Sequence, residues 1–198
     1  MKLLHTTDLH FNKKWFKWLY EQQDSYDLLC ITGDFLEPRK MEPLEVQIEW
    51  ISDKLRKFEK PLFICSGNHD VELPERENWL GEIGSVYADD SIVQIGGVKI
   101  GCVPYLAPDF TAFGECDVVL YHLPPAKSKT AINAKDGNDW GDKALYKLLH
   151  NALVAPQLLL CGHNHHPLAI TDTIRETTIY NPGSNKYSDT PSHIFLKL

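Results

Sequence analysis

Residues 61–70, with the sequence Pro-Leu-Phe-Ile-Cys-Ser-Gly-Asn-His-Asp, join a short apolar run to a polar turn. The apolar half predicts a buried strand over 61–65, and the glycine and asparagine that follow are typical of a turn that ends a strand. The same order recurs four more times, and each time the residues after the strand include Asp, His or Asn. These predicted strands and turns are 2–7 before Asp8-Leu9-His10, 27–32 before Gly33-Asp34, 118–121 before His122, and 157–161 before Gly162-His163-Asn164-His165.

The short apolar runs alternate with stretches of helical periodicity, which indicates an α/β fold. Helices are expected over 13–23, 43–58 and 142–152, the last capped by Asp142. Further strands are predicted over 85–87, 92–95, 98–103, 167–172, 177–180 and 193–196, with a hairpin turn at Gly96-Gly97 and the last three forming a closing meander. The expected fold is therefore two packed mixed β-sheets, a sandwich flanked by helices. With no linker or repeat, one domain should span residues 1–198.

Composition limits the classes of protein to consider. Hydrophobic residues make up 43% of the chain and charged residues 24%, as in ordinary globular proteins. The net charge is −7, and broad nucleic-acid binding is disfavoured, although a local basic patch is not excluded. No apolar run is long enough to span a bilayer, and the first residues lack the apolar stretch of a signal peptide. The five cysteines form no C-x-x-C pair, so we expect free thiols and a cytoplasmic protein.

The five polar turns are expected to meet. In α/β sheets, ligands collect outside the carboxyl ends of the strands, so the simplest geometry brings all five turns to one rim. Each motif alone is also a common way to make a turn or cap a helix. Five of them in order, each directly after a predicted strand, instead favour one shared site.

The order of motifs resembles that of the calcineurin-like metallophosphoesterases, which is D-x-H, G-D, G-N-H-[DE], H and G-H-x-H. All five are present here, the third being Gly67-Asn68-His69-Asp70. The resemblance implies a four-layer sandwich and two bound divalent metal ions. It places Asp8, His10, Asp34 and His165 on one ion, and Asp34, Asn68, His122 and His163 on the other. His69 is then expected to stay off the metals and face the substrate, with Asp70 orienting it from behind.

This ligand set suits the hydrolysis of an anionic phosphoester. Two metal ions lower the pKa of a shared water and neutralise the phosphoryl oxygens, while a bridging carboxylate such as Asp34 sets their separation. Imidazole, carboxylate and amide ligands without thiolate suit Mn²⁺, Fe, Zn²⁺ or Co²⁺, of which we favour Mn²⁺. His69 can protonate the leaving alkoxide, and a carboxylate beside it would favour the imidazolium form that a general acid needs.

Departures from related groups narrow the substrate. The Asp-Arg-Gly of the protein Ser/Thr phosphatases is missing after Asp34, and no gap between motifs can hold the capping domain of the double-strand-break nucleases. His122-Leu123-Pro124-Pro125 resembles the H-x-P-P region of small phosphodiesterases. The sequence therefore favours a phosphodiesterase acting on a small-molecule or nucleotide phosphoester. The alternatives are a phosphomonoesterase or protein phosphatase, and a non-catalytic scaffold.

Other polar residues are open to two interpretations. Arg39 lies one position late for the phosphate-binding arginine of the protein phosphatases. Lys127, Lys129 and Lys135 follow His122 in a long predicted loop over 123–141, where they can meet a substrate phosphate or simply be solvated. In the same loop, Trp140 can stack on a base, cover the site or anchor the loop. His166 is expected to be a solvated neighbour.

Overall fold

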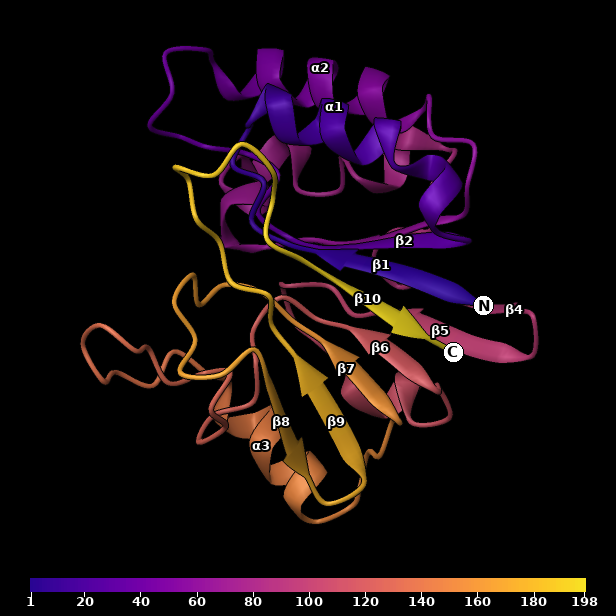
Figure 1. Cartoon of the computed structure of the whole chain (residues 1–198), viewed down its shortest axis with the longest axis vertical. Helices are drawn as coiled ribbons and strands as arrows, with labels where there is room; N and C mark the ends of the chain where they lie inside the picture. Colours follow the sequence, from indigo (N-terminus) through magenta and orange to yellow (C-terminus); the bar gives the residue numbers. More distant parts are fainter.

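A computed structural model describes all 198 residues, and two β-sheets packed face to face form its centre (Figure 1). The first sheet has four strands in the order β10-β1-β2-β3. Their bounds are His193–Lys197 for β10, Lys2–Thr6 for β1, Leu28–Thr32 for β2 and Leu62–Cys65 for β3. The three strands β1, β2 and β3 are parallel, and β10 pairs with β1 in the antiparallel sense.

The second sheet has six strands in the order β4-β5-β6-β7-β9-β8. They are β4 (Ile92–Ile95), β5 (Val98–Cys102), β6 (Val118–Leu120), β7 (Leu158–Leu160), β8 (Thr171–Ile174) and β9 (Thr177–Tyr180). The four inner strands are parallel, and each edge strand, β4 or β8, forms an antiparallel hairpin with its neighbour. The glycine pair at 96–97 connects β4 to β5, as predicted.

Three helices cover the outer faces of the sandwich, which gives four layers (Figure 1). Helices α1 (Lys13–Glu21) and α2 (Leu44–Leu55) lie on the first sheet, and α3 (Lys143–His150) lies on the second. Side-chain caps fix two of the helix starts: Asn12 accepts a hydrogen bond from the N–H of Lys14, and Asp142 accepts from Ala144 and Leu145. The predicted helices and the predicted sandwich are confirmed.

The core has three parts. Ten buried residues from both sheets, including Leu3, Phe63 and Leu160, fill the space between the sheets. Larger clusters join the outer face of the first sheet to α1 and α2, and that of the second to α3. Because both of its faces are covered, β2 is buried along its whole length, as expected for a central parallel strand.

Three sequence expectations about strands were wrong. Residues 85–87 contribute only a single bridge, between Tyr87 and Phe63. The strand expected over 167–172 begins instead at Thr171, because residues 167–170 cross toward the site loops, where Leu168 N–H donates to the Ile132 carbonyl. The expected closing meander divides between the sheets, since β8 and β9 join the second sheet whereas β10 pairs with β1. None of the helices has the length and apolar character needed to cross a membrane.

The register of the parallel strands decides where the polar turns lie. Thr6 is level with Ile31, and Thr32 is level with Cys65, so β1, β2 and β3 end along one edge of the first sheet. In the second sheet Leu120 is level with Leu160, so β6 and β7 also end together. The turns that follow these five strands therefore meet where the two sheet edges adjoin.

Candidate metal centre

The seven predicted ligands and His69 come together across the seam between the two sheets. Those that follow strands of the first sheet are Asp8 and His10 after β1, Asp34 after β2, and Asn68 and His69 after β3. Those that follow strands of the second sheet are His122 after β6, and His163 and His165 after β7. Neither sheet alone carries a complete set of ligands, so the site depends on how the two sheets pack.

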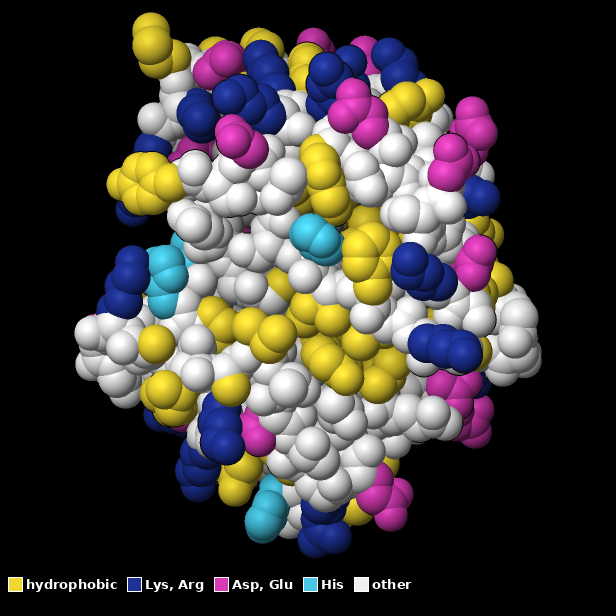
Figure 2. All heavy atoms as spheres, in the orientation of Figure 1, with side chains coloured by type: hydrophobic (Ala, Val, Ile, Leu, Met, Phe, Trp, Pro, Cys, Tyr) yellow, Lys and Arg dark blue, Asp and Glu magenta, His cyan; other side chains and the backbone are white.

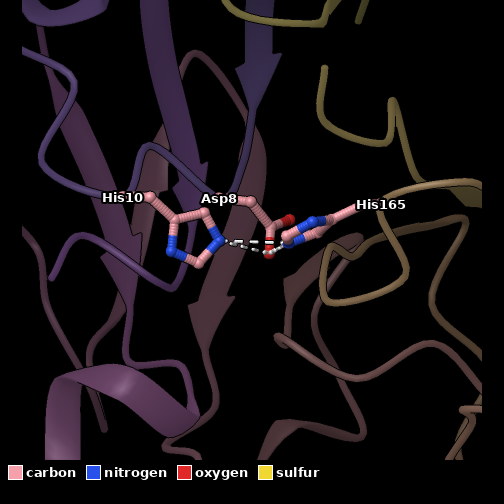
Figure 3. Close-up of side chains that lie close together, drawn as sticks. All are labelled: Asp8, His10 and His165. Carbon is pink, nitrogen blue, oxygen red and sulfur yellow. Dashed lines mark hydrogen bonds and ion pairs between the residues drawn. The ribbon is translucent and has the colours of Figure 1, made fainter. Parts of the chain in front are cut away.

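One group consists of Asp8, His10 and His165 (Figure 3). The Nε2 atoms of the two imidazoles lie 3.0 Å apart, and Asp8 Oδ1 lies 3.2 Å from His165 Nε2 and 3.8 Å from His10 Nε2. Asp8 Oδ1 is buried and has no hydrogen-bond partner, whereas Asp8 Oδ2 accepts the N–H of His163 at 3.0 Å. One oxygen of Asp8 is thus held by the backbone, and the other points at the two imidazoles.

The second group consists of Asp34, Asn68, His122 and His163. Asn68 Oδ1 lies 3.0 Å from His163 Nδ1 and 3.2 Å from His122 Nε2, and Asp34 Oδ2 lies 3.4 Å from His122 Nε2. Asp34 Oδ2 is also 3.9 Å from His10 Nε2, in the first group. Asp34 therefore lies between the two groups, where a bridging carboxylate is expected.

These donors fit divalent cations. His122 Nδ1 donates to the Thr32 carbonyl at 2.8 Å, which leaves the lone pair of Nε2 directed at the cluster. Histidines that bind metals typically donate their other ring N–H to a carbonyl or carboxylate in this way. The Nε2 atoms of His10 and His165 lie close together, and Asp8 Oδ1 has no hydrogen-bond partner. A metal ion bound among these three atoms would supply the positive charge that they are missing. No cysteine takes part, so the donor set favours the metals that bind imidazole and carboxylate together.

The electrostatics of the cluster also favour a cation. Burial pushes the pKa of Asp8 up, but the close approach of His165 and the nearby His122 outweigh burial and hold that pKa well below its usual range. Burial likewise pushes the pKa of His122 down, but Asp34 and Asp8 raise it to about 9. The carboxylates therefore stay ionised, and without a metal their negative charge draws a proton onto His122.

The backbone is strained at the ligands. Asp8, His10, Asp34 and His163 all have positive φ, at 53°, 43°, 55° and 65°, a region that residues other than glycine rarely adopt. Strain of this kind persists only where the surrounding structure imposes it, and four of the ten residues other than glycine with positive φ are predicted ligands of this centre. The left-handed turns let each chain segment present its side chain immediately after a strand ends.

Close packing behind the ligands makes a prediction for Gly162. A Cβ at this position would lie 1.8 Å from the Thr7 hydroxyl oxygen and 2.8 Å from Asp8 Oδ2. The Thr7 hydroxyl has little freedom to move, because it lies 2.8 Å from Asp8 Oδ2 and 2.7 Å from the Thr32 carbonyl. Gly162→Ala should therefore lower the free energy of unfolding of the metal-free protein by about 1–3 kcal/mol, measured by urea denaturation.

Gly81→Ala is the matched control for this prediction, because a Cβ there meets no atom within 4 Å. Its free energy of unfolding should stay within about 0.5 kcal/mol of wild type. Equal stability of the two alanine variants would contradict the close packing of Gly162 against Thr7.

The surroundings of His69 differ from expectation. Asp70 does not orient the His69 ring: its Oδ1 accepts the N–H groups of Phe35 and Leu36, and its Oδ2 accepts that of Gly67. Because its carboxylate is buried and satisfied by backbone, Asp70 instead fixes the turn after β2 against the turn after β3. The partner of the His69 ring is Glu72, whose Oε1 lies 2.6 Å from His69 Nδ1.

The position of His69 itself leaves its other ring nitrogen facing the site. Its backbone N–H donates to Asp34 Oδ1 at 3.0 Å, and its Nε2 lies 4.0 Å from Asp34 Oδ2. The sequence contained a signal for Glu72: it is three residues after His69, in the short 3₁₀ turn Asn68–Val71 and its cap, where side chains i and i+3 eclipse.

A polar pocket of about 310 Å³ opens over the centre. Some of the residues whose role the sequence left open line its wall. Arg39, Trp140 and His166 line it, and the Trp140 ring lies 6.1 Å from that of His163. Lys135 lies in the adjoining pocket, with its Nζ 2.6 Å from His166 Nε2. Trp140 thus covers one side of the site and is not buried as an anchor.

The other two loop lysines do not line the pocket. The Lys127 ammonium lies over the ring of Tyr146, on α3, and the backbone N–H of Lys129 donates to Asp172 at 2.7 Å. The loop itself is tied to the last motif, because Asn133 donates to Asn164 Oδ1. Sequence reasoning missed Asn181, a buried residue that donates to the Gly162 carbonyl at 2.8 Å and braces that motif; only its position after β9 hinted at this.

Comparison with known proteins agrees with the motifs. The sequence profile of the calcineurin-like phosphoesterases matches residues 1–167. The chain belongs to the calcineurin-like phosphoesterase family, whose members are hydrolases of phosphoesters and typically bind divalent metals. No curated protein is detectably similar in sequence.

Solved structures share the fold at low sequence identity. The protein TT1561 of Thermus thermophilus is 12% identical, with a TM-score of 0.66 over 92% of this chain and 88% of its own. An archaeal phosphodiesterase is 14% identical, with a TM-score of 0.54 over 99% and 100%. The sulfate thiohydrolase SoxB of Thermus thermophilus is 13% identical, with a TM-score of 0.54 over 90% of this chain and 38% of its own. At these identities the likeness concerns the fold alone.

Proposed function

We propose that this chain is a single-domain, metal-dependent phosphodiesterase that hydrolyses a small-molecule or nucleotide phosphoester. The observation that carries the proposal is the arrangement of the donors in two groups on either side of Asp34. Asp8, His10 and His165 would hold one ion with Asp34, and Asn68, His122 and His163 would hold the other. A binding scaffold has no need of two complete groups of ligands.

Two divalent ions bound in these groups would activate a water and neutralise charge on the phosphoryl oxygens. The protein's own contribution to bond cleavage is His69, whose Nε2 faces the pocket while Nδ1 donates to Glu72. As the oxygen of water bonds to phosphorus and the water releases a proton to solvent, the bond to the leaving alkoxide breaks. His69 Nε2 gives that alkoxide a proton, and solvent then reprotonates His69. The products are a phosphomonoester and an alcohol. We favour Mn²⁺ as the metal and the cytoplasm as the compartment.

The proposal is tested by two model substrates after chelation and readdition of metal. With Mn²⁺ restored, the protein should hydrolyse bis-p-nitrophenyl phosphate with a higher kcat/KM than p-nitrophenyl phosphate. The reverse order would make it a phosphomonoesterase. If neither ester is hydrolysed with Mn²⁺, Zn²⁺, Fe²⁺ or Co²⁺, the result would favour the non-catalytic scaffold.

Glu72 is expected to position His69. Glu72→Gln should keep the hydrogen bond to Nδ1 but lose the charge that stabilises the imidazolium, so kcat should fall about tenfold while KM changes little. Glu75→Gln, in the neighbouring exposed turn, is the control. If both variants behave as wild type, Glu72 has no such role.

A further inference from the structure

A series of adjoining pockets leads from the metal centre to the outer helices. The pocket over the centre shares His10, Arg39 and His165 with a second pocket of about 600 Å³. The second shares Lys40 and Tyr187, among others, with a third of about 390 Å³. The third meets a groove of about 410 Å³ between α1 and α2 through Lys13. Each pocket thus shares at least one lining residue with the next, and this row of four adjoining pockets is called the track below.

The track is basic although the protein is acidic. Nine of the 20 Lys and Arg line it, against only four of the 27 Asp and Glu, so it carries a net positive charge on a chain of net charge −7. Of the nine, only Lys13 and Lys17 pair with a carboxylate, at 3.5 and 3.6 Å. In Figure 2, several Lys and Arg side chains lie at the end of the molecule formed by α1 and α2, with Asp and Glu side chains among them.

Aromatic side chains are spaced along the same track. Trp140 stands over the metal centre and is 48% exposed, and Tyr187, in the second and third pockets, is 86% exposed. In the groove between α1 and α2, Tyr20 and Trp50 lie among Lys54 and Lys57. Of these rings, Tyr20, Trp140 and Tyr187 are exposed, and cations beside exposed rings are the combination that holds a phosphate backbone while its bases stack.

We propose that this track binds a single-stranded oligonucleotide and leads one of its phosphodiesters to the metal centre. The inference rests on the proposed function, since it names the substrate class of the same site. An acidic peptide could also pair with the lysines, but it contains no phosphoester bond for the proposed site to hydrolyse. A duplex would satisfy them too, but its stacked bases could not reach the rings of Tyr187 and Trp140.

The net charge conceals this surface, because the acidic residues that outnumber the basic ones lie mostly elsewhere. Glu37, Glu42 and Asp189 are the only acidic residues of the track apart from Asp34 in the metal centre. Binding by such a surface should weaken as salt concentration rises, because each phosphate contact releases a counterion.

The test compares two lengths of substrate with the Mn²⁺-loaded protein. Oligothymidylate of about 15 nucleotides should be cleaved with a kcat/KM about tenfold or more above that of the thymidine dinucleotide, because only the longer strand reaches the α1–α2 groove. The double variant Lys54→Glu with Lys57→Glu should reduce this ratio about fivefold or more. Lys143→Glu with Lys147→Glu is the matched control, since α3 lies at the opposite end of the molecule (Figure 1). Its ratio should match wild type.

Two results would overturn the inference: a length ratio near one in wild type, or an equal fall in both double variants. A further arm measures fluorescence anisotropy of the labelled oligonucleotide with and without heparin, and with Tyr187→Ala. Tyr187→Ala should weaken binding about fivefold or more. Heparin that competes as well as unlabelled oligonucleotide, with no effect of Tyr187→Ala, would show a surface for any polyanion and overturn the inference. If bis-p-nitrophenyl phosphate is not hydrolysed, the proposed function fails, whereas the anisotropy still tests the track.

Discussion

Asp34→Asn should remove both metal ions and lower hydrolysis of bis-p-nitrophenyl phosphate about a thousandfold or more. Asp34 Oδ2 is the oxygen that lies near His122 and also near His10, so the change removes one negative charge from both groups at once. Loss of metal forfeits several kcal/mol of stabilisation of the transition state, which corresponds to this loss of rate. Metal content by elemental analysis and kcat/KM with added Mn²⁺ are the measurements.

The asparagine keeps the shape of Asp34 and can still accept the N–H of His69, so the fold should survive. Urea denaturation of the metal-free proteins checks this, and Asp24→Asn, at an exposed position, controls for the loss of a carboxylate. A variant that retains two ions per chain would refute the bridging position of Asp34.

His69→Asn should separate catalysis from metal binding. With the general acid removed, kcat is expected to fall about 10²- to 10⁴-fold on a diester with an alkyl leaving group. The fall should be much smaller on bis-p-nitrophenyl phosphate, because nitrophenolate leaves readily without a proton. Metal content should stay at the wild-type level.

The position of His69 also allows it to be a metal ligand, which would contradict its role as general acid. Its Nε2 lies close enough to His10 and Asp34 to form a third possible group of ligands. Loss of one ion in His69→Asn would therefore make His69 a ligand, and an equal loss of rate on both substrates would remove it as the acid. His150→Asn, on the exposed end of α3, is the control.

The sequence predicted most of the fold because the strands carry strong local signals. The almost wholly apolar β2 and the Gly-Asn turn after β3 are typical of a buried strand and of a strand end. The strand expected over 85–87 failed because a short β-rich segment is stable only if a partner edge is free along its length, and here only Tyr87 meets β3. The partner of β10 depends on contacts between the two ends of the chain, which no local pattern encodes.

The sequence predicted the residues of the candidate site, but not the contacts that hold those residues in place. Asp, His and Asn directly after strands are visible in the sequence, and the parallel register brings them together. The role expected of Asp70 differed because an aspartate side chain beside a turn satisfies backbone N–H groups before it can reach a neighbouring ring. The sequence did not reveal the basic surface of the track, because the net charge of the chain does not show where on the surface the basic residues lie.

The seam on which the metal centre lies has a consequence for the whole molecule. Each candidate group of ligands takes members from both sheets, so an ion bound there would link two halves that are otherwise joined by apolar contacts. By linkage, ions that bind only the folded sandwich would raise its free energy of unfolding by an amount that grows with the logarithm of their affinity. Loosening the contacts between the sheets, far from any ligand, should conversely release metal. Retention of ions therefore reports on how tightly the two halves are closed.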